Sequence, residues 1–203
     1  MLSNKLKKEV KYCIGIDEVG RGPLAGPVAV CALSLPINFK DKRFAKFKDS
    51  KKLSADQREK WLLLIDEERK KGNIKYAVCF ESNTVIDKKG IVYAIKSALK
   101  KSINKITNEP GECRVLLDGG LKAPIEFIKQ ETIIKGDEKK LAIALASIVA
   151  KVARDKIMVN LAKTYPQYGF EKHKGYGTAF HGKMICKNGL SKIHRQSFCR
   201  AYK

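Results

Sequence analysis

A short apolar segment that runs into two adjacent carboxylates and then a glycine-rich turn constrains the fold of this chain more than any other feature. Residues 13–16 have the apolar character of a buried strand, and the apolar run 28–35 predicts a second strand beyond the turn. Asp17 and Glu18 lie between them. Successive strand side chains face opposite sides of a sheet, so both carboxylates reach one place only if the backbone turns or bulges there. The glycines that follow allow such a turn, which predicts a chemical site at this strand end; a plain hairpin with a solvated strand end is the alternative.

The same pattern, an apolar run closed by a carboxylate and glycine, occurs twice more. One run ends at Asp118, before two glycines, and a β-branched run closes with Gly-Asp at Asp137. Because ligands of α/β sheets bind beyond the strand ends, we expect these two acids to converge on the first pair. An ordinary Asp-Gly turn is the alternative at Asp118. Asp155 is the alternative fourth acid, and we prefer Asp137 because it ends a predicted strand.

Helical patterns separate the predicted strands, which indicates an α/β fold. Ser54 and Gln57 have the spacing of a capping box at a helix start, and Asn83 or Thr84 can cap a second, amphipathic helix. In chain order we expect helices over residues 54–72, 83–103 and 138–162, a third strand over 74–80, and a short helix followed by a basic tail from 181 onward.

The charge of the chain indicates a polyanionic partner. It has 203 residues, with 42 Lys and Arg against 21 Asp and Glu and a formal net charge of +21. Nucleic acid is favoured over a membrane because the lysines are spread along the chain and no apolar run approaches the roughly 20 residues that cross a bilayer. A lysine-rich proteome would produce a similar composition without this function. The first residues lack the apolar segment of a secretory signal, so we expect a cytoplasmic protein.

Cysteine and histidine spacing does not predict a zinc site. The six cysteines form no CxxC pair, and four lie in apolar runs, so we expect buried, reduced thiols. His173, His181 and His194 match neither each other nor the cysteines in the spacing of zinc ligands. We therefore expect surface or nucleic-acid-facing histidines.

Several basic residues are candidates for phosphate contacts. Lys51 and Lys52 precede the first predicted helix, where they would bind a phosphate or only keep a loop soluble. Ser147, Lys151 and Asp155 are spaced i, i+4 and i+8 on one helix face. This face either meets a substrate strand or carries a simple salt bridge.

Aromatic residues alternate with cations and glycines over residues 165–178. His173, Lys174 and Tyr176 belong to this segment. An aromatic ring can stack on a base or sugar while neighbouring cations bind phosphates, which favours a nucleic-acid contact. A tyrosine-rich cover over the core is the alternative.

Taken in order, seven motifs resemble those of the ribonuclease HII family, and the resemblance covers roughly residues 12–199. The motifs are GIDEVGRGPLAGPV, DSKKLS, LLDGG, IIKGD, ASIVAKVARD, YPQYGFEKHKGYGTAFH and HRQSF. The resemblance implies an RNase H-like fold, a five-stranded mixed β-sheet flanked by helices with a helical C-terminal extension. It also implies an endonuclease that hydrolyses the RNA strand of RNA–DNA hybrids and cuts 5′ to a single ribonucleotide in duplex DNA, leaving 3′-hydroxyl and 5′-phosphate ends. Such an enzyme would act in ribonucleotide removal and RNA primer processing.

By this resemblance, four acids would hold two divalent ions, Mn²⁺ or Mg²⁺, and four further residues would recognise the ribonucleotide. The acids are Asp17, Glu18, Asp118 and Asp137, with Asp17 bridging both ions. Gly20, Arg21 and Gly22 match the loop whose backbone contacts the 2′-hydroxyl, and Tyr176 matches a ring that stacks on the next sugar. The two glycines after Asp118 depart from the expected Gly-Asn, which concerns loop shape and not the acids.

The resemblance also divides the chain. Residues 1–11 would be a basic N-terminal segment, residues 12–162 the catalytic domain, and residues 163–203 a substrate-binding loop and helical extension of the same domain. The sister family ribonuclease HIII carries an extra N-terminal domain, for which about 11 residues leave no room. A catalytically silent module that binds hybrids is the other alternative. We expect a monomer whose partners are RNA–DNA hybrids and ribonucleotide-containing DNA, not membranes.

Overall fold

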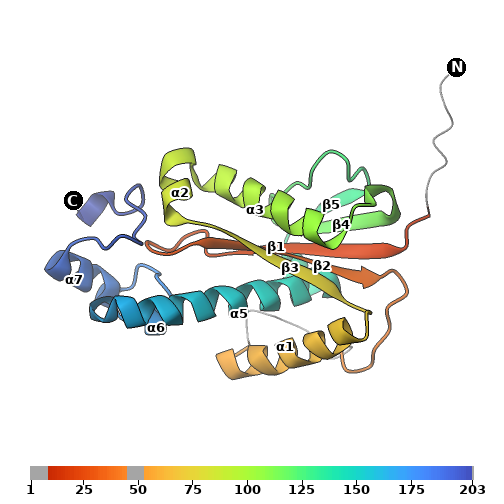
Figure 1. The fold of residues 1–203 in the computed structure, drawn as a ribbon, viewed down its shortest axis with the longest axis horizontal. Coiled ribbons are helices and arrows are strands. Elements are labelled where there is room, and N and C mark those ends of the chain that lie inside the picture. Colours follow the sequence, from red (N-terminus) through yellow and green to blue (C-terminus); the bar gives the residue numbers. More distant parts are fainter. Residues whose placement is uncertain (1–8, 45–52, 203) are drawn as a thin grey trace, which may run out of the picture.

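The computed structural model describes residues 9–44 and 53–202, which form a five-stranded mixed sheet with helices on both faces (Figure 1). The strand order is β3-β2-β1-β4-β5. β1 pairs antiparallel with β2, and β2 with β3, whereas β4 runs parallel to β1 and β5 parallel to β4. The predicted fold class is confirmed. The strands are β1 (Tyr12–Val19), β2 (Val28–Pro36), β3 (Lys75–Glu81), β4 (Cys113–Asp118) and β5 (Gln130–Ile133).

Seven α-helices are described besides short 3-10 turns. They are α1 (Ala55–Lys70), α2 (Asn83–Lys89), α3 (Ile91–Ile106), α4 (Gly136–Lys139), α5 (Leu141–Thr164), α6 (Phe170–His173) and α7 (Ala179–Asn188). α2 and α3 cover one face of the sheet, and α5 and α1 cover the other (Figure 1).

The interior strand β2 is apolar except for Ser34 because it is buried on both faces. Val28, Val30 and Ala32 pack toward α3, whereas Cys31 and Leu33 pack toward α5 and α1. This alternation is the two-residue period of a strand, and burial of both faces replaces the usual polar positions with apolar ones.

Two predicted helices differ from the structure at identifiable residues. The single helix expected over 83–103 is broken at Gly90, whose φ of 84° is incompatible with a continuous helix, and it is capped by Ser82 instead of Asn83 or Thr84. The helix expected from residue 138 starts at Leu141, because the extended Lys140 separates it from α4. The capping box of Ser54 and Gln57 is confirmed.

A glycine in β1 brings the longest helix directly onto the sheet. A Cβ at Gly15 would lie 2.1 Å from the carbonyl carbon of Ala142, in the first turn of α5. Glycine is therefore the residue that allows the α5 backbone to lie on β1.

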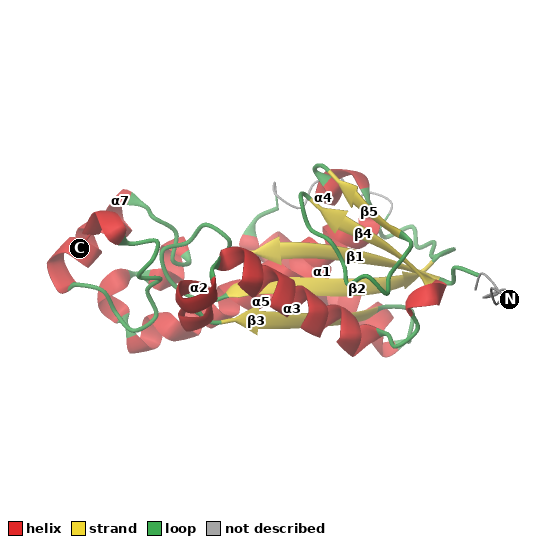
Figure 2. Cartoon of the chain, turned by 90° about the horizontal axis from the view of Figure 1, so that it is seen from above, coloured by secondary structure: helices red, strands yellow, loops and turns green. Residues whose placement is uncertain are grey.

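The C-terminal segments gather beyond the end to which β1 points (Figure 2). They enclose a small core of their own that includes Met158, Tyr168, Phe170 and Ile185. No helix among residues 9–44 and 53–202 combines the length and apolar character needed to cross a bilayer.

The prediction of surface histidines is wrong for two of the three. His181 is completely buried and His194 is 1% exposed. The Ser191 N–H donates to His194 Nδ1, so the proton is on His194 Nε2, 3.0 Å from His181 Nε2. His181 Nδ1 then donates to the Tyr176 carbonyl at 2.9 Å. The chain of bonds satisfies both rings inside the C-terminal core, which the spacing of histidines in the sequence does not reveal.

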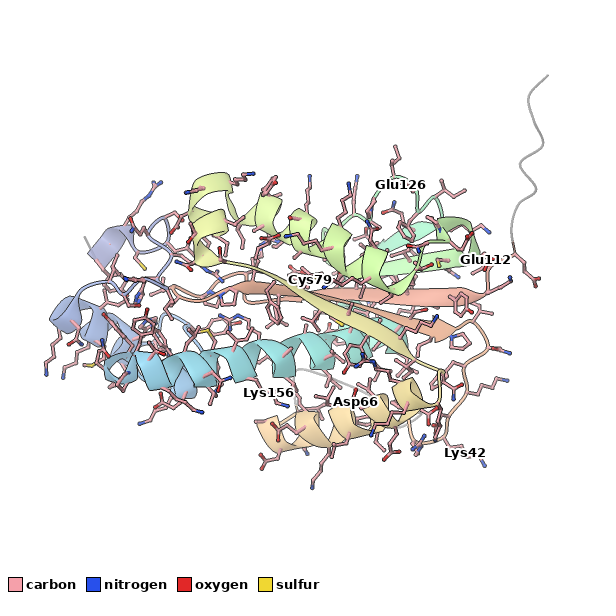
Figure 3. All side chains as sticks on the ribbon, in the orientation of Figure 1. Lys42, Asp66, Cys79, Glu112, Glu126 and Lys156 are labelled. Atoms are coloured by element: carbon pink, nitrogen blue, oxygen red, sulfur yellow. The ribbon has the colours of Figure 1, made fainter. Side chains whose placement is uncertain are left out.

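The cysteine prediction holds for four of six residues. Four are buried and reduced: Cys31, Cys79, Cys113 and Cys199. Cys79 lies on the edge strand β3 (Figure 3). Cys13 and Cys186 are also free thiols; Cys13 is partly buried, and Cys186, on the outer surface of α7, is exposed.

Candidate active site

Most of the predicted site residues meet in one cleft of about 370 Å³. The cleft lies where β1 and β4 end, and α5, α1 and the segment before α7 complete its walls. The residues that line it are Asp17, Glu18, Val19, Gly20, Arg21, Gly22, Arg58, Asp118, Ser147, Ile148, Lys151 and Tyr176.

The lengths of β1 and β4 explain how two adjacent strand residues reach the same cleft. The pairing of β1 with β2 continues without a bulge to Val19, and the glycine turn follows it. The pairing of β1 with β4 stops at Ile16. Asp17 and Glu18 are therefore paired with β2 on one side but have no β4 neighbour on the other. Both side chains reach the cleft at this open edge of β1. Asp118, the last residue of β4, joins them from the neighbouring strand.

Burial, and to a lesser extent the neighbouring carboxylates, raise the pKa values of Asp17 and Glu18 in the cleft. Burial raises the pKa of Asp17 to about 7, and the nearby charges of Glu18 and Asp118 add to the shift. A hydrogen bond from Ser147 and the Glu18 N–H, 2.8 Å from Asp17 Oδ1, oppose it. Burial also raises the pKa of Glu18, against the effect of the Arg21 guanidinium 3.6 Å away. The site therefore has an excess of partly buried negative charge that a cation would neutralise.

The oxygen ligands fit a hard divalent cation that keeps part of its water shell. Within residues 9–44 and 53–202, no group of three or more His, Cys, Asp or Glu side chains has the arrangement of a metal site as the side chains stand. Mg²⁺ usually binds proteins through one or two carboxylates and completes its octahedron with water and substrate phosphate. Asp17, Glu18 and Asp118 supply that kind of incomplete oxygen set.

Asp137 does not line the cleft; it lines a separate pocket with Phe44 and Leu141. Its side chain is almost completely buried, and the preceding residue, Gly136, donates its N–H to Asp118 Oδ1 at 2.7 Å. The expectation that Asp137 ends a strand is wrong. β5 stops at Ile133, Lys135 adopts a left-handed conformation, and Asp137 lies in the short helix α4.

Asp155, the alternative fourth acid, belongs to a second groove of about 690 Å³. Lys151 donates to its carboxylate at 2.9 Å, and Arg58 lies 3.9 Å from it. Lys151 and Arg58 line both the cleft and the groove, which therefore adjoin. Asp155 is thus paired with cations at the boundary of the cleft, and the salt bridge with Lys151, one of the two alternatives for this helix face, is present.

The remaining predicted basic contacts lie outside the cleft. Lys174 lines the second groove with Lys156, which is labelled in Figure 3. His173 Nε2 contacts the Tyr168 carbonyl at 2.8 Å, and its Nδ1 accepts the Gly175 N–H. Lys51 and Lys52 lie outside the described residues.

Tyr176 presents its ring to the cleft and is 40% exposed. The Lys151 ammonium lies 5.8 Å and the Arg154 guanidinium 5.7 Å from the ring centroid. An exposed ring supported by two cations suits a stacking surface next to a phosphate backbone.

Three arginines at or below the cleft were not among the residues predicted from the sequence. Arg58 lines it from α1, whereas Arg154 and Arg195 lie fully buried beneath the glycine turn. Arg154 and Arg195 belong to the motifs ASIVAKVARD and HRQSF, but nothing in either motif separates a buried arginine from a solvated one.

The strand order and the helices on both faces of the sheet define a protein of the RNase H-like fold class. Its fold matches ribonuclease H2 from Pyrococcus horikoshii, with a TM-score of 0.70, 24% identity and coverage of 94% of this chain and 96% of that one. It also matches Bst-RNase HIII in complex with Mn²⁺, with a TM-score of 0.62, 20% identity and coverage of 93% and 67%.

Sequence similarity identifies the family within this class. The family model described as ribonuclease HII matches residues 14–201. Ribonuclease HII of Bacillus cytotoxicus is 45% identical over 196 residues, 96% of this chain and 71% of the relative. Ribonuclease HII of Endomicrobium trichonymphae is 44% identical over 184 residues, 91% and 83% of the two chains. The chain belongs to the ribonuclease HII family, and it is a ribonuclease H-type endonuclease that acts on RNA–DNA hybrids.

Proposed function

We propose that this enzyme cuts the RNA strand of hybrids and also cuts 5′ to a single ribonucleotide in duplex DNA, leaving 3′-hydroxyl and 5′-phosphate ends. The observation that carries the proposal is the group of partly buried carboxylates on β1 and β4, in a cleft rimmed by Arg21, Arg58 and Lys151. Negative charge at the centre suits cations, and positive charge at the rim suits the phosphates of a substrate strand.

Asp17, Glu18, Asp118 and Asp137 would hold two divalent ions, Mg²⁺ or Mn²⁺. Bound there, the ions would activate the attacking water and stabilise the leaving 3′-oxygen. The chain's own hydrogen bonds orient two of these acids, since Ser147 and the Glu18 N–H hold Asp17, and the Gly136 N–H holds Asp118. The Mn²⁺ in the ribonuclease HIII complex supports this choice of ion.

Recognition of the ribonucleotide would come from the two elements that flank the carboxylates. The backbone of residues 20–22 would contact the 2′-hydroxyl, and the Tyr176 ring would pack on the next, deoxyribose sugar. Ser147 and Lys151 would contact the cleaved strand. This assignment is supported by the place of all these residues in one cleft.

The second groove would receive a further part of the duplex backbone. Lys156, Lys172 and Lys174 line it, and it meets the cleft at Arg58 and Lys151. A row of cations that continues from the cleft suits the repeating phosphates of a nucleic acid strand. Lys51, Lys52 and His173 stay predicted contacts.

In the cell the enzyme would remove single ribonucleotides from DNA and process RNA primers, as a cytoplasmic monomer. Residues 12–162 would carry catalysis, and residues 163–203 would complete the substrate site.

The test is cleavage of three labelled duplexes of one sequence: all DNA, DNA with one ribonucleotide, and an RNA–DNA hybrid. With Mg²⁺ or Mn²⁺ we expect cutting of the last two, and in the single-ribonucleotide duplex one cut on the 5′ side of the ribonucleotide. EDTA should abolish both cuts. Binding without cleavage in either ion would support the silent module, and cleavage of the hybrid alone would remove the single-ribonucleotide activity from the proposal.

A further inference from the structure

Two arginines are completely buried beneath the cleft without a carboxylate partner among the described residues. Arg154 belongs to α5, and Arg195 follows α7; both are 0% exposed. Burial lowers the pKa of both guanidinium groups, and that of Arg195, at about 9, stays above neutral pH. A buried charge is expensive unless its hydrogen bonds are satisfied, and here backbone carbonyls satisfy them.

Arg195 binds three carbonyls of the glycine turn. Its Nη2 donates to Gly20 at 2.7 Å, its Nη1 to Arg21 at 2.9 Å, and its Nε to Gly26 at 3.0 Å. In a trans peptide the carbonyl and the following N–H point in opposite directions. When Arg195 holds the carbonyls of Gly20 and Arg21, the N–H groups of Arg21 and Gly22 point away from it.

These two N–H groups belong to residues that line the cleft, and within the described part of the chain neither donates to another group. They are therefore available to a substrate oxygen. The peptide planes that present them are the ones that Arg195 holds from below.

Arg154 connects the same turn to the segment of Tyr176. It donates to the carbonyls of Pro27 at 2.9 Å, Ala25 at 3.3 Å and Lys174 at 3.0 Å. A Cβ at Gly20 would lie 2.1 Å from Arg154 Nε, so the turn lies directly on the guanidinium. The two elements proposed to read the sugars thus share one support.

The C-terminal segment holds the turn through its backbone as well. The Arg195 N–H donates to the Leu24 carbonyl at 2.7 Å, and the Gly26 N–H donates to the Ile193 carbonyl at 2.9 Å. Ala25 and His194 form a β-bridge between these bonds. Residues 193–195 therefore form a short antiparallel backbone pairing with residues 24–26.

We propose that Arg195 is a positioning residue for ribose recognition. It fixes two peptide planes, and the N–H groups of those planes, at Arg21 and Gly22, donate hydrogen bonds to the 2′-hydroxyl oxygen. The inference rests on the proposed function of the turn. Arginine suits the task because its planar fork reaches three carbonyls at once, whereas lysine has one donor atom on a flexible stem.

The test uses Arg195→Lys, which keeps the charge but loses the fork. Fluorescence anisotropy with Ca²⁺ in place of a catalytic ion gives the affinity for a duplex with one ribonucleotide and for the all-DNA duplex. We expect the ratio of the two affinities to fall by about tenfold or more, equivalent to about 1.4 kcal/mol. The control is Leu99→Ala, a core variant of α3 on the far face of the sheet, which should lower thermal stability and leave the ratio unchanged.

A ratio in Arg195→Lys equal to that of the unmodified protein would overturn the inference. An unmodified protein that does not prefer the ribonucleotide at all would instead overturn the proposed function of the turn. The two failures are therefore distinguishable.

A second measurement needs no variant. Backbone NMR order parameters of Arg21 and Gly22 in the free protein should equal those of β1, at about 0.85, because Arg195 holds both peptide planes before substrate binds. Values below about 0.6 would mean that the turn is not held in advance and would overturn the inference.

Discussion

Replacing Gly15 by alanine should disturb both the stability and the activity of the enzyme. The added Cβ would lie 2.1 Å from the Ala142 carbonyl carbon and 2.4 Å from the Ile143 nitrogen, more than 1 Å inside ordinary contact with backbone that has no rotamer to change. The start of α5 must therefore move away from β1. Overpacking of this kind costs about 3 kcal/mol, which lowers the melting temperature of a domain of this size by about 6–12 °C.

The displacement should reach the cleft because α5 also carries Ser147 and Lys151. A misplacement of about 1 Å can reduce turnover about 100-fold. Calorimetry and hybrid cleavage measure the two effects in Gly15→Ala. The control is Gly120→Ala, because a Cβ there meets nothing within 4 Å and the residue lies near Asp118. If Gly15→Ala melts and cuts like the unmodified protein, α5 does not lie on β1 as described.

Three further predictions concern the fourth acid, the stacking ring and the buried histidines. Asp137→Asn should lose most hybrid cleavage, whereas Asp155→Asn should keep a substantial part; the reverse result in folded variants would make Asp155 the metal ligand. Tyr176→Ala should lose about 1–3 kcal/mol more of transition-state stabilisation on a single-ribonucleotide duplex than on a hybrid. Equal relative losses on the two substrates, with a lowered melting temperature, would mean that the ring only covers the core. Burial and the neighbouring His181 lower the pKa of His194 to about 4, so the unfolded chain binds more protons below pH 6.5 and stability falls as pH decreases. Urea unfolding should show a loss of about 2 kcal/mol between pH 7 and pH 5, and the same loss in His194→Gln would exclude this residue as its source.

The carboxylates of β1 and β4 could be predicted from the sequence because the residues next to them in the chain indicate that each stands at the end of a strand. Each follows an apolar run, and the ends of neighbouring strands meet at one edge of a sheet. The glycine turn and the shared helix face of Ser147 and Lys151 could be predicted for the same reason, since both depend on residues near one another in the chain.

Features that depend on distant packing could not be predicted. The bond from Arg195 to the Gly20 carbonyl joins residues 175 positions apart, and Arg58 reaches the cleft only because α1 packs beside α5. The burial of His181 and His194 likewise depends on how the C-terminal segments fold over one another. The turn that moves Asp137 from a strand end into α4 results from a left-handed lysine, a conformation that lysine rarely adopts.

The most direct test of whether the acids at the strand ends hold the catalytic ions is the variant Asp118→Asn. Its rate of hybrid cleavage and its affinity for the hybrid are measured together. The substitution removes one metal ligand and leaves Arg21, Arg58 and Lys151 at the rim of the cleft. With saturating Mg²⁺, cleavage should fall by at least about 100-fold while the affinity for the hybrid changes by less than about threefold. Near-normal turnover in this variant would contradict the assignment of the metal site.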